Sequence, residues 1–132
     1  MRITNEADYA LRFLCVLAGG GQRSAKAISE ETGVTLRFAL KILRKLALAG
    51  VVGSQQGAAG GYFLSRPPEA LSVGEVVEII DGPLQINNCI DESYCCSRTG
   101  LAHTDCRMHL FFSGLNERLR REMYAATIDR FL

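Results

Sequence analysis

Apolar residues recur every three or four positions through the first fifty residues, a period typical of amphipathic helices. The first such stretch predicts a helix over residues 5–18, with Asn5 as its N-cap. Three consecutive glycines at 19–21 end it, because glycine favours turns over helix interiors. The expected apolar positions are Ala7, Ala10, Leu11, Leu14, Leu17 and Ala18.

Two shorter helices are predicted next. Ser24 caps a helix that extends to Glu31 and stops at Gly33, while Thr35 caps a helix that closes at Gly50. The expected buried stripe of the latter is Leu36, Ala39, Leu40, Leu43, Leu46 and Ala47. Two such helices form a helix-turn-helix, whose second helix enters the major groove of DNA, although similar pairs also occur in plain bundles.

A β-hairpin is predicted directly after this pair, with strands at 51–54 and 61–65 and a glycine-containing loop at 55–60. Glycine permits positive φ and lets the backbone approach a phosphate closely. A hairpin in this position is typical of the wing of a winged helix, and it favours DNA binding over a plain bundle. The predicted fold class is therefore mainly α with a small β wing.

The remaining chain predicts a helix capped by Ser72 that runs through Ile80, then an irregular stretch at 84–105. One long helix follows from Cys106 to about Phe131. It is apolar on one side (Leu110, Phe111, Leu115, Leu119, Met123, Ala126) and charged on the other (Glu117, Arg118, Arg120, Arg121, Glu122).

A helix of that length beside so small a domain needs a partner surface. We expect it to pack against its twin in a homodimer, and the alternative is that it folds back on its own domain. The predicted domains are a winged helix-turn-helix DNA-binding domain at 1–66 and a region of sensor loop and dimerisation helices at 67–132.

Composition agrees with one compact domain and a modest extension, since the chain has 132 residues of which 48% are hydrophobic. No apolar run approaches the length of a membrane span, and the N-terminus turns acidic at once, so we expect a cytoplasmic protein with no membrane partner.

Net charge is only +1, yet the signs are unevenly distributed. Residues 22–66 hold two acids and the cations Arg23, Lys26, Arg37, Lys41, Arg44, Lys45 and Arg66, whereas residues 69–92 hold six acids and no Lys or Arg. This division indicates that the first half meets a polyanion, unless the cations form an ordinary solvated face.

The chain has five cysteines. Cys15 lies in the first helical pattern and is expected to be a small core residue. The others, Cys89, Cys95, Cys96 and Cys106, crowd into eighteen positions. In a reducing cytoplasm such a cluster favours metal binding or redox chemistry over structural disulfides.

Several motifs occur together: Met1-Arg2-Ile3-Thr4, Asp8-Tyr9-Ala10-Leu11-Arg12, Ala49-Gly50-Val51-Val52, Gly57-x-x-Gly60-Gly61-Tyr62-x-Leu64 and the late cysteines. Over nearly the whole chain they resemble the IscR/NsrR/CymR-type transcription regulators, the Rrf-two family. The resemblance implies a winged-helix dimer with crossing C-terminal helices that represses or activates stress and iron–sulfur genes. Many members hold an iron–sulfur cluster in the loop before the long helix.

Candidate DNA contacts follow from the helix-turn-helix and the wing. Arg37 and Lys41 lie one turn apart, where base edges are reached, and Arg44 and Lys45 are expected to neutralise phosphates. Phe38 fits either the core or the interface. The further candidates are Arg2, Ser24, Lys26, Thr35, Gln55, Gln56, Gly57, Gly60 and Tyr62. The expected partner is a palindromic duplex operator, and repression is the expected output.

Thiolates are soft ligands that suit iron–sulfur clusters and zinc. The gap between Cys89 and Cys95 matches the family's first spacing, but Cys106 comes later than the family pattern, which leaves the cluster type (2Fe–2S or 4Fe–4S) open. The expected ligands are Cys89, Cys95 and Cys106, with Cys96 as a substitute or supplement. A dithiol switch without metal is the alternative, and zinc is a third option that lacks paired C-x2-C spacing.

The resemblance also implies a carboxylate ligand from the partner subunit at the position of Asp8, which otherwise is a first-turn acid that stabilises the helix N-terminus. His103 and His109 flank Cys106 and are alternative ligands. We expect no enzyme, because the sequence has no C-x-x-C, P-loop, G-x-G-x-x-G or metalloprotease motif. A DNA-free interaction protein is the other alternative, which salt-dependent binding to a duplex would exclude.

Overall fold

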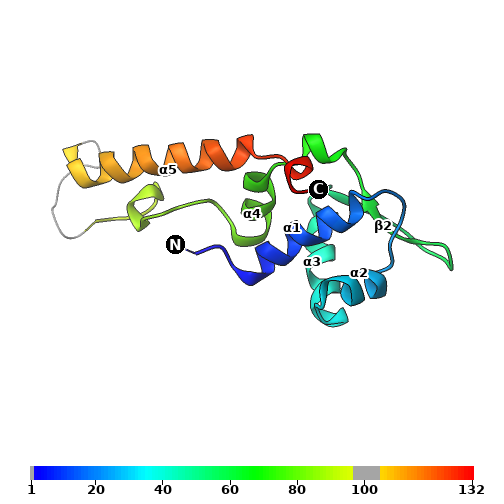
Figure 1. The fold of residues 1–132 in the computed structure, drawn as a ribbon. Coiled ribbons are helices and arrows are strands. Elements are labelled where there is room, and N and C mark those ends of the chain that lie inside the picture. The colour runs from blue at the N-terminus through cyan, green and yellow to red at the C-terminus, as the bar shows by residue number, and fades with distance from the viewer. Residues whose placement is uncertain (1, 97–104) are drawn as a thin grey trace.

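The computed structural model describes residues 2–96 and 105–132. The helices and strands pack into a small domain at one end, and a long helix extends away from it (Figure 1). In chain order the elements are α1 (Asn5–Leu17), α2 (Ala25–Thr32), α3 (Leu36–Leu48), β1 (Val52–Gln55), β2 (Gly61–Leu64), η1 (Pro68–Ala70), α4 (Val73–Asp81), η2 (Asn88–Ile90), α5 (Arg107–Ala125) and η4 (Ile128–Phe131).

Side-chain caps set the beginning of four helices. The predicted caps Ser24, Thr35 and Ser72 are confirmed, because each side chain accepts a hydrogen bond from the backbone three residues later. The prediction of Asn5 was wrong. Thr4 caps α1 through a 3.1 Å bond from the Ala7 N–H. Asp81 holds Thr4 in place by accepting its backbone N–H at 3.1 Å, a tertiary contact that local sequence does not contain.

The predicted buried stripe of α3 is confirmed at three of its six positions. Ala39, Leu43 and Leu46 are buried as expected, and Ile42 joins them. Leu36 and Leu40 are instead 45% and 43% exposed. At 3.6 residues per turn the helix has more apolar residues than one face accommodates, so those on the flank remain at the surface.

The wing is an antiparallel pair in which Val52 lies opposite Leu64 and Gln55 opposite Gly61. Gln55 therefore belongs to the first strand rather than to the loop. Arg23 adds a short bridge to the outer side of the hairpin: its N–H donates to the Tyr62 carbonyl at 2.9 Å, and the Tyr62 N–H donates back at 2.7 Å. The bridge ties the wing to the start of α2.

The long helix ends at Ala125, not at Phe131 as predicted. There the chain leaves the helix because the Ala126 carbonyl accepts the Val73 N–H at 2.8 Å, and the Ile128 N–H donates to Leu71 at 2.9 Å. Ile128 is 1% exposed and lies in the core. The C-terminal residues thus fold back on their own domain, while α5 itself runs past it.

One main core holds the domain together. It includes Phe13 of α1, Ile28 of α2 and Leu43 of α3, and it also includes Val76 of α4 and Ile128. Burial of such side chains stabilises the fold by about 1.5–3 kcal/mol each. The second half of the chain therefore contributes to the same core as the helix-turn-helix. Among the described residues, no helix is both long and apolar enough to cross a membrane.

Candidate nucleic-acid interface and cysteine segment

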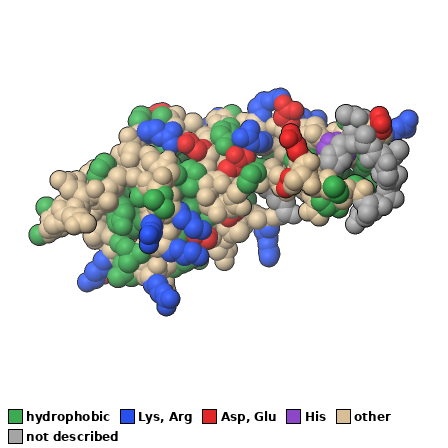
Figure 2. All heavy atoms as spheres, turned by 180° about the vertical axis from the view of Figure 1, so that it is seen from behind, with side chains coloured by type: hydrophobic (Ala, Val, Ile, Leu, Met, Phe, Trp, Pro, Cys, Tyr) green, Lys and Arg blue, Asp and Glu red, His purple; other side chains and the backbone are tan. Residues whose placement is uncertain are grey.

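The outer face of α3 gathers the predicted base-contacting residues. Arg37, Lys41 and Arg44 are exposed there at successive turns, and Thr35 is exposed at the helix start. They border a shallow depression lined by Thr35, Arg37, Phe38, Leu40, Lys41, Arg44, Lys45 and Leu48. Hydrophobic side chains ringed by lysines and arginines gather at the lower left of Figure 2. The face thus presents cationic and apolar side chains next to one another.

Glu6 of α1 was not among the predicted site residues. Its carboxylate lies 2.7 Å from Lys45 Nζ and 3.9 Å from Lys41 Nζ. Lys45 is half-buried in this pair, whereas the side chain of Lys41 is 59% exposed. Lys41 is therefore the more available of the two cations. Sequence gave no signal for the pairing, because Glu6 and the lysines come from different helices.

Phe38 lies between the core and the interface. Its ring packs edge to face against Tyr9, with centroids 5.8 Å apart, and Lys41 Nζ lies 5.8 Å from its centroid. Such a cation–aromatic contact orients an exposed lysine. Phe38 therefore supports the position of Lys41 from below.

The beginning of α2 borders the same interface. Ser24 Oγ accepts the Ala27 N–H at 3.0 Å, and Lys26, the second residue of the helix, is exposed. Arg23 is held by Glu31 at 2.6 Å. Lys26 is thus presented at a helix N-terminus, the end that favours a phosphate.

The wing has an exposed tip at Gln56 and Gly57, while Gln55 bonds to Gln22. Gly60 is required by its surroundings, since a Cβ there would lie 2.1 Å from the Gln55 carbonyl oxygen. Tyr62 is half-buried behind the tip. Gly60 of the glycine motif is therefore needed, because the backbone at Gln55 passes too close to leave room for a side chain.

Arg2 is exposed but lies apart from α3. It borders a small pocket with Asp81, Pro83 and Leu84, next to the end of α4. Among the predicted contacts it is the one placed beside the second half of the chain.

The four clustered cysteines belong to the cysteine segment, residues 84–106. Cys89 lies in η2 and is half-buried, Cys95 is exposed, Cys96 is half-buried, and Cys106 forms the N-cap position of α5. Within residues 2–96 and 105–132, no three His, Cys, Asp or Glu side chains form a group able to hold a metal ion. His109 is half-buried on α5, and His103 lies outside the described residues.

The donor chemistry fits an iron–sulfur cluster, since the segment supplies four thiols. Among the described residues of this single subunit, the thiols do not form a group of three metal-binding side chains. Asp8, the predicted ligand from the partner, accepts from Arg12 Nε at 2.8 Å. Cys15 packs half-buried against the core, and burial raises the pKa of its thiol.

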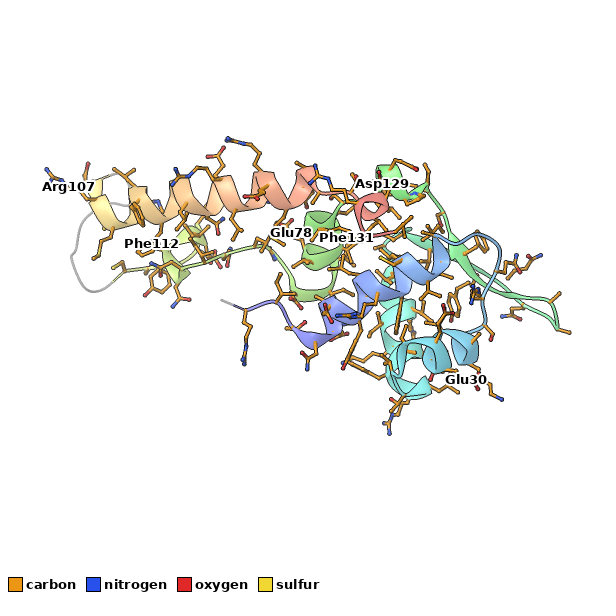
Figure 3. All side chains as sticks on the ribbon, in the orientation of Figure 1. Glu30, Glu78, Arg107, Phe112, Asp129 and Phe131 are labelled. Carbon is orange, nitrogen blue, oxygen red and sulfur yellow. The ribbon has the colours of Figure 1, made fainter. Side chains whose placement is uncertain are left out.

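A polar cluster that sequence reasoning missed anchors the cysteine segment. Glu78 of α4 faces α5 (Figure 3) and accepts from Arg120 Nε at 2.8 Å, Tyr124 Oη at 2.8 Å and the Leu84 N–H at 3.3 Å. The hydrogen bond from Arg120 is the main reason that the pKa of Glu78 is lowered. Asn116, 7% exposed, bonds to the backbone of Leu84 and Ile86. The start of the segment is thereby fixed to α4 and α5.

Comparison with protein families gives a match over residues 3–132 to Rrf2, described as an iron-dependent transcriptional regulator. The chain belongs to the Rrf2 family. It is 33% identical over 110 residues to Protein rrf2 of Nitratidesulfovibrio vulgaris, covering 79% of this chain and 71% of that protein. It is 31% identical over 87 residues to the regulator CymR of Bacillus subtilis, covering 64% and 63% of the two chains. The chain thus spans between 63% and 71% of the length of these two relatives.

Solved structures confirm the winged-helix fold of this Rrf2-family chain. The B. subtilis cysteine regulator CymR superposes with a TM-score of 0.77 at 21% identity, covering 98% of this chain and 94% of CymR. T. potens IscR superposes with a TM-score of 0.72 at 22% identity, covering 98% and 84%. The predicted family and fold class are confirmed, and the chain is a transcriptional regulator of this family.

Proposed function

We propose that this Rrf2-family regulator binds a palindromic operator as a homodimer and represses transcription. The observation that supports this best is the face of α3, where Arg37, Lys41 and Arg44 point outward beside the wing. Recognition helices present their N-terminal residues to base edges, so Arg37 and Lys41 are the proposed base contacts. Arg44, Lys26, Ser24 and the wing tip are the proposed phosphate contacts.

Dimerisation through α5 follows from its uncovered apolar residues. Met108, Leu110 and Phe111 are 73%, 55% and 60% exposed, and Leu115 is 37% exposed. Arg107 and Phe112 mark the part of the helix that extends past the domain (Figure 3). A cluster of exposed apolar side chains on a small protein indicates an interaction surface. A twofold dimer through α5 presents two copies of α3, which accounts for a palindromic operator.

The test of DNA binding is Lys41→Ala. Because the side chain of Lys41 is exposed, the variant is expected to fold normally. It is expected to bind selected duplexes about a hundredfold more weakly, since a base contact worth about tenfold is lost in each of the two half-sites. Binding is measured by fluorescence anisotropy at several salt concentrations. Arg130→Ala, an exposed cation of η4, is the matched control and is expected to bind like the wild type. Unchanged affinity of Lys41→Ala refutes its placement in the interface.

We further propose that the cysteine segment is the sensor. Cys89, Cys95 and Cys106 would hold an iron–sulfur cluster, with Cys96 as a supplement and Asp8 of the partner as the further ligand. A bound cluster supplies a group that iron, oxidants or nitric oxide alter. Both ends of the cysteine segment are attached to α5. Cys106 directly precedes the helix, and the Ile86 N–H near the other end donates to Asn116, so a change in the segment is expected to move α5.

The second candidate is a thiol switch without metal. It is favoured by the exposure of Cys95, which lies next to the half-buried Cys96. In that case an oxidant converts a thiolate to a sulfenic acid, and a second thiol displaces water to form a disulfide.

Anaerobic purification and reconstitution with iron and sulfide distinguish the two sensors. A coloured protein with stoichiometric iron and sulfide, lost in Cys106→Ser and retained in Cys15→Ser, supports the cluster. A colourless, iron-free product refutes it. Diamide-induced loss of DNA binding that dithiothreitol reverses then supports the thiol switch.

A further inference from the structure

Two leucines lie on the outer face of α3, where the apolar pattern predicted burial. Leu36 is 45% exposed and Leu40 is 43% exposed. Leu40 lies one turn after Arg37 and one turn before Arg44, and it lines the depression between them. An apolar side chain therefore lies directly beside the cations of this surface.

The core has no room for these two leucines. The core side of α3 is filled by Ala39, Ile42, Leu43 and Leu46, each 0% exposed. Single exposed leucines are common and need no explanation. Leu36 and Leu40, however, are four positions apart on one side of a helix, so they form an adjacent apolar pair in its N-terminal half.

The cations beside Leu36 and Leu40 indicate what kind of molecule this surface binds. A second protein surface of apolar character would have to bury Arg37, Lys41 and Arg44 without neutralising them, at a large desolvation cost. The major groove of duplex DNA offers phosphates to the cations and, at each thymine, a C5-methyl group to the leucines.

We propose that Leu40, flanked by Leu36, recognises thymine methyl groups in the major groove and so makes thymine a determinant of the operator. The inference rests on the proposed DNA-binding function and specifies it. Burying one methyl group contributes about a fourfold preference over the base that lacks it. Two half-sites of a dimer then give about a fifteenfold preference.

The test uses uracil, which keeps the hydrogen-bonding edge of thymine and lacks only the methyl group. Duplexes are first selected from a random pool with the full-length protein, and each thymine of the selected site is then replaced by deoxyuridine. We expect one or two positions per half-site at which the wild type loses about fourfold in affinity. At those positions Leu40→Ala is expected to bind thymine and uracil duplexes equally.

Leu132→Ala is the matched control, since Leu132 is 64% exposed and does not line the depression on α3. It is expected to keep the wild-type preference for thymine. Thermal melts verify that the variants fold, as expected for exposed positions. A wild type that selects no duplex contradicts the DNA-binding function itself. Binding of thymine and uracil duplexes with equal affinity at every position, or an unchanged preference in Leu40→Ala, overturns the role of Leu40 alone.

Discussion

At the scale of single residues, Glu78 links α4 to α5 and to the start of the cysteine segment. Its neighbours in the sequence do not indicate these contacts. Its side chain is 18% exposed and accepts hydrogen bonds from two residues of α5 and from the backbone of the cysteine segment. Hydrogen bonds from Arg120, from Tyr124 and from the Leu84 N–H outweigh burial, so the pKa of Glu78 lies below its ordinary value of 4.5. The ionised carboxylate is therefore the form that the fold favours.

Glu78→Gln is expected to lower the free energy of unfolding by about 1 kcal/mol at pH 7, because hydrogen bonds to a charged acceptor are replaced by weaker ones. A pKa that is lower in the folded than in the unfolded state stabilises the protein above the unfolded value. This contribution is lost as the pH falls below 4.5 and through the folded pKa. The difference between the two proteins, measured by urea unfolding at pH 7 and at pH 3, is therefore expected to shrink at low pH.

Glu69→Gln is the control for this prediction, since Glu69 is exposed on η1. It is expected to match the wild type at both pH values. A deficit of Glu78→Gln that is equally large at pH 3 would contradict the assigned role of the ionised carboxylate.

At the scale of elements, α4, α5 and the start of the cysteine segment are held together by close packing and hydrogen bonds. Tyr124 of α5 packs so closely on Gly74 of α4 that a Cβ there would lie 2.3 Å from its ring. Asn116 attaches the segment to α5: its Oδ1 accepts the Ile86 N–H at 3.0 Å, and its Nδ2 donates to the Leu84 carbonyl at 2.9 Å. A buried amide that satisfies two backbone groups fixes the register between a helix and an irregular segment.

Asn116→Ala is expected to destabilise the protein by about 2 kcal/mol, because it leaves buried backbone groups without partners. Hydrogen exchange of the Ile86 amide is expected to accelerate more than that of amides in α3. The exposed Asn88, replaced by Ala, is the matched control, and its exchange and stability should follow the wild type. Unaltered protection of Ile86 in Asn116→Ala would show that the amide does not hold the segment.

At the scale of the whole molecule, the proposed DNA interface lies at one end. The domain with α3 and the wing occupies that end in Figure 1, and α5, with residues 84–96 beside it, extends toward the other. Met108, Leu110, Phe111 and Leu115 of α5 are exposed. We propose that a second subunit buries these residues. The dimer would then connect the cysteine segment of each subunit with its DNA interface.

Phe111→Glu is expected to convert the dimer to a monomer in analytical ultracentrifugation, since a charge would be buried against the twin helix. Affinity for a palindromic duplex is expected to fall about a hundredfold or more, because the two half-sites are then bound independently. Leu48→Glu is the control for a charge at an exposed leucine and should remain dimeric. A wild type that sediments as a monomer, or a dimeric Phe111→Glu, would exclude this interface.

Much of the fold could be predicted from the sequence because its signals are local. The caps Ser24, Thr35 and Ser72 bond within their own first turns, and Gly33 adopts the left-handed conformation expected of a helix stop. The wing followed from two short strand-like runs on either side of a glycine-containing loop. The cationic face of α3 also followed, because polar residues of an amphipathic helix point to solvent.

Predictions failed where two local solutions were equally good and a distant contact chose between them. Thr4 and Asn5 both suit a cap, and Asp81 selects Thr4. The apolar run near the C-terminus continues past Ala125, but bonds to Leu71 and Val73 end the helix there. The phase of α3 depends on which flank α1, α2 and the wing cover.

The sequence by itself determined the family, the order of elements and the chemistry available, since caps, periodicity and cysteine content depend on neighbours along the chain. Only the tertiary structure decided which leucines of α3 remain outside, which lysine Glu6 holds and how Glu78 and Asn116 fix the cysteine segment. These outcomes are contacts between residues far apart in the chain. Their free energies depend on packing that no local pattern encodes.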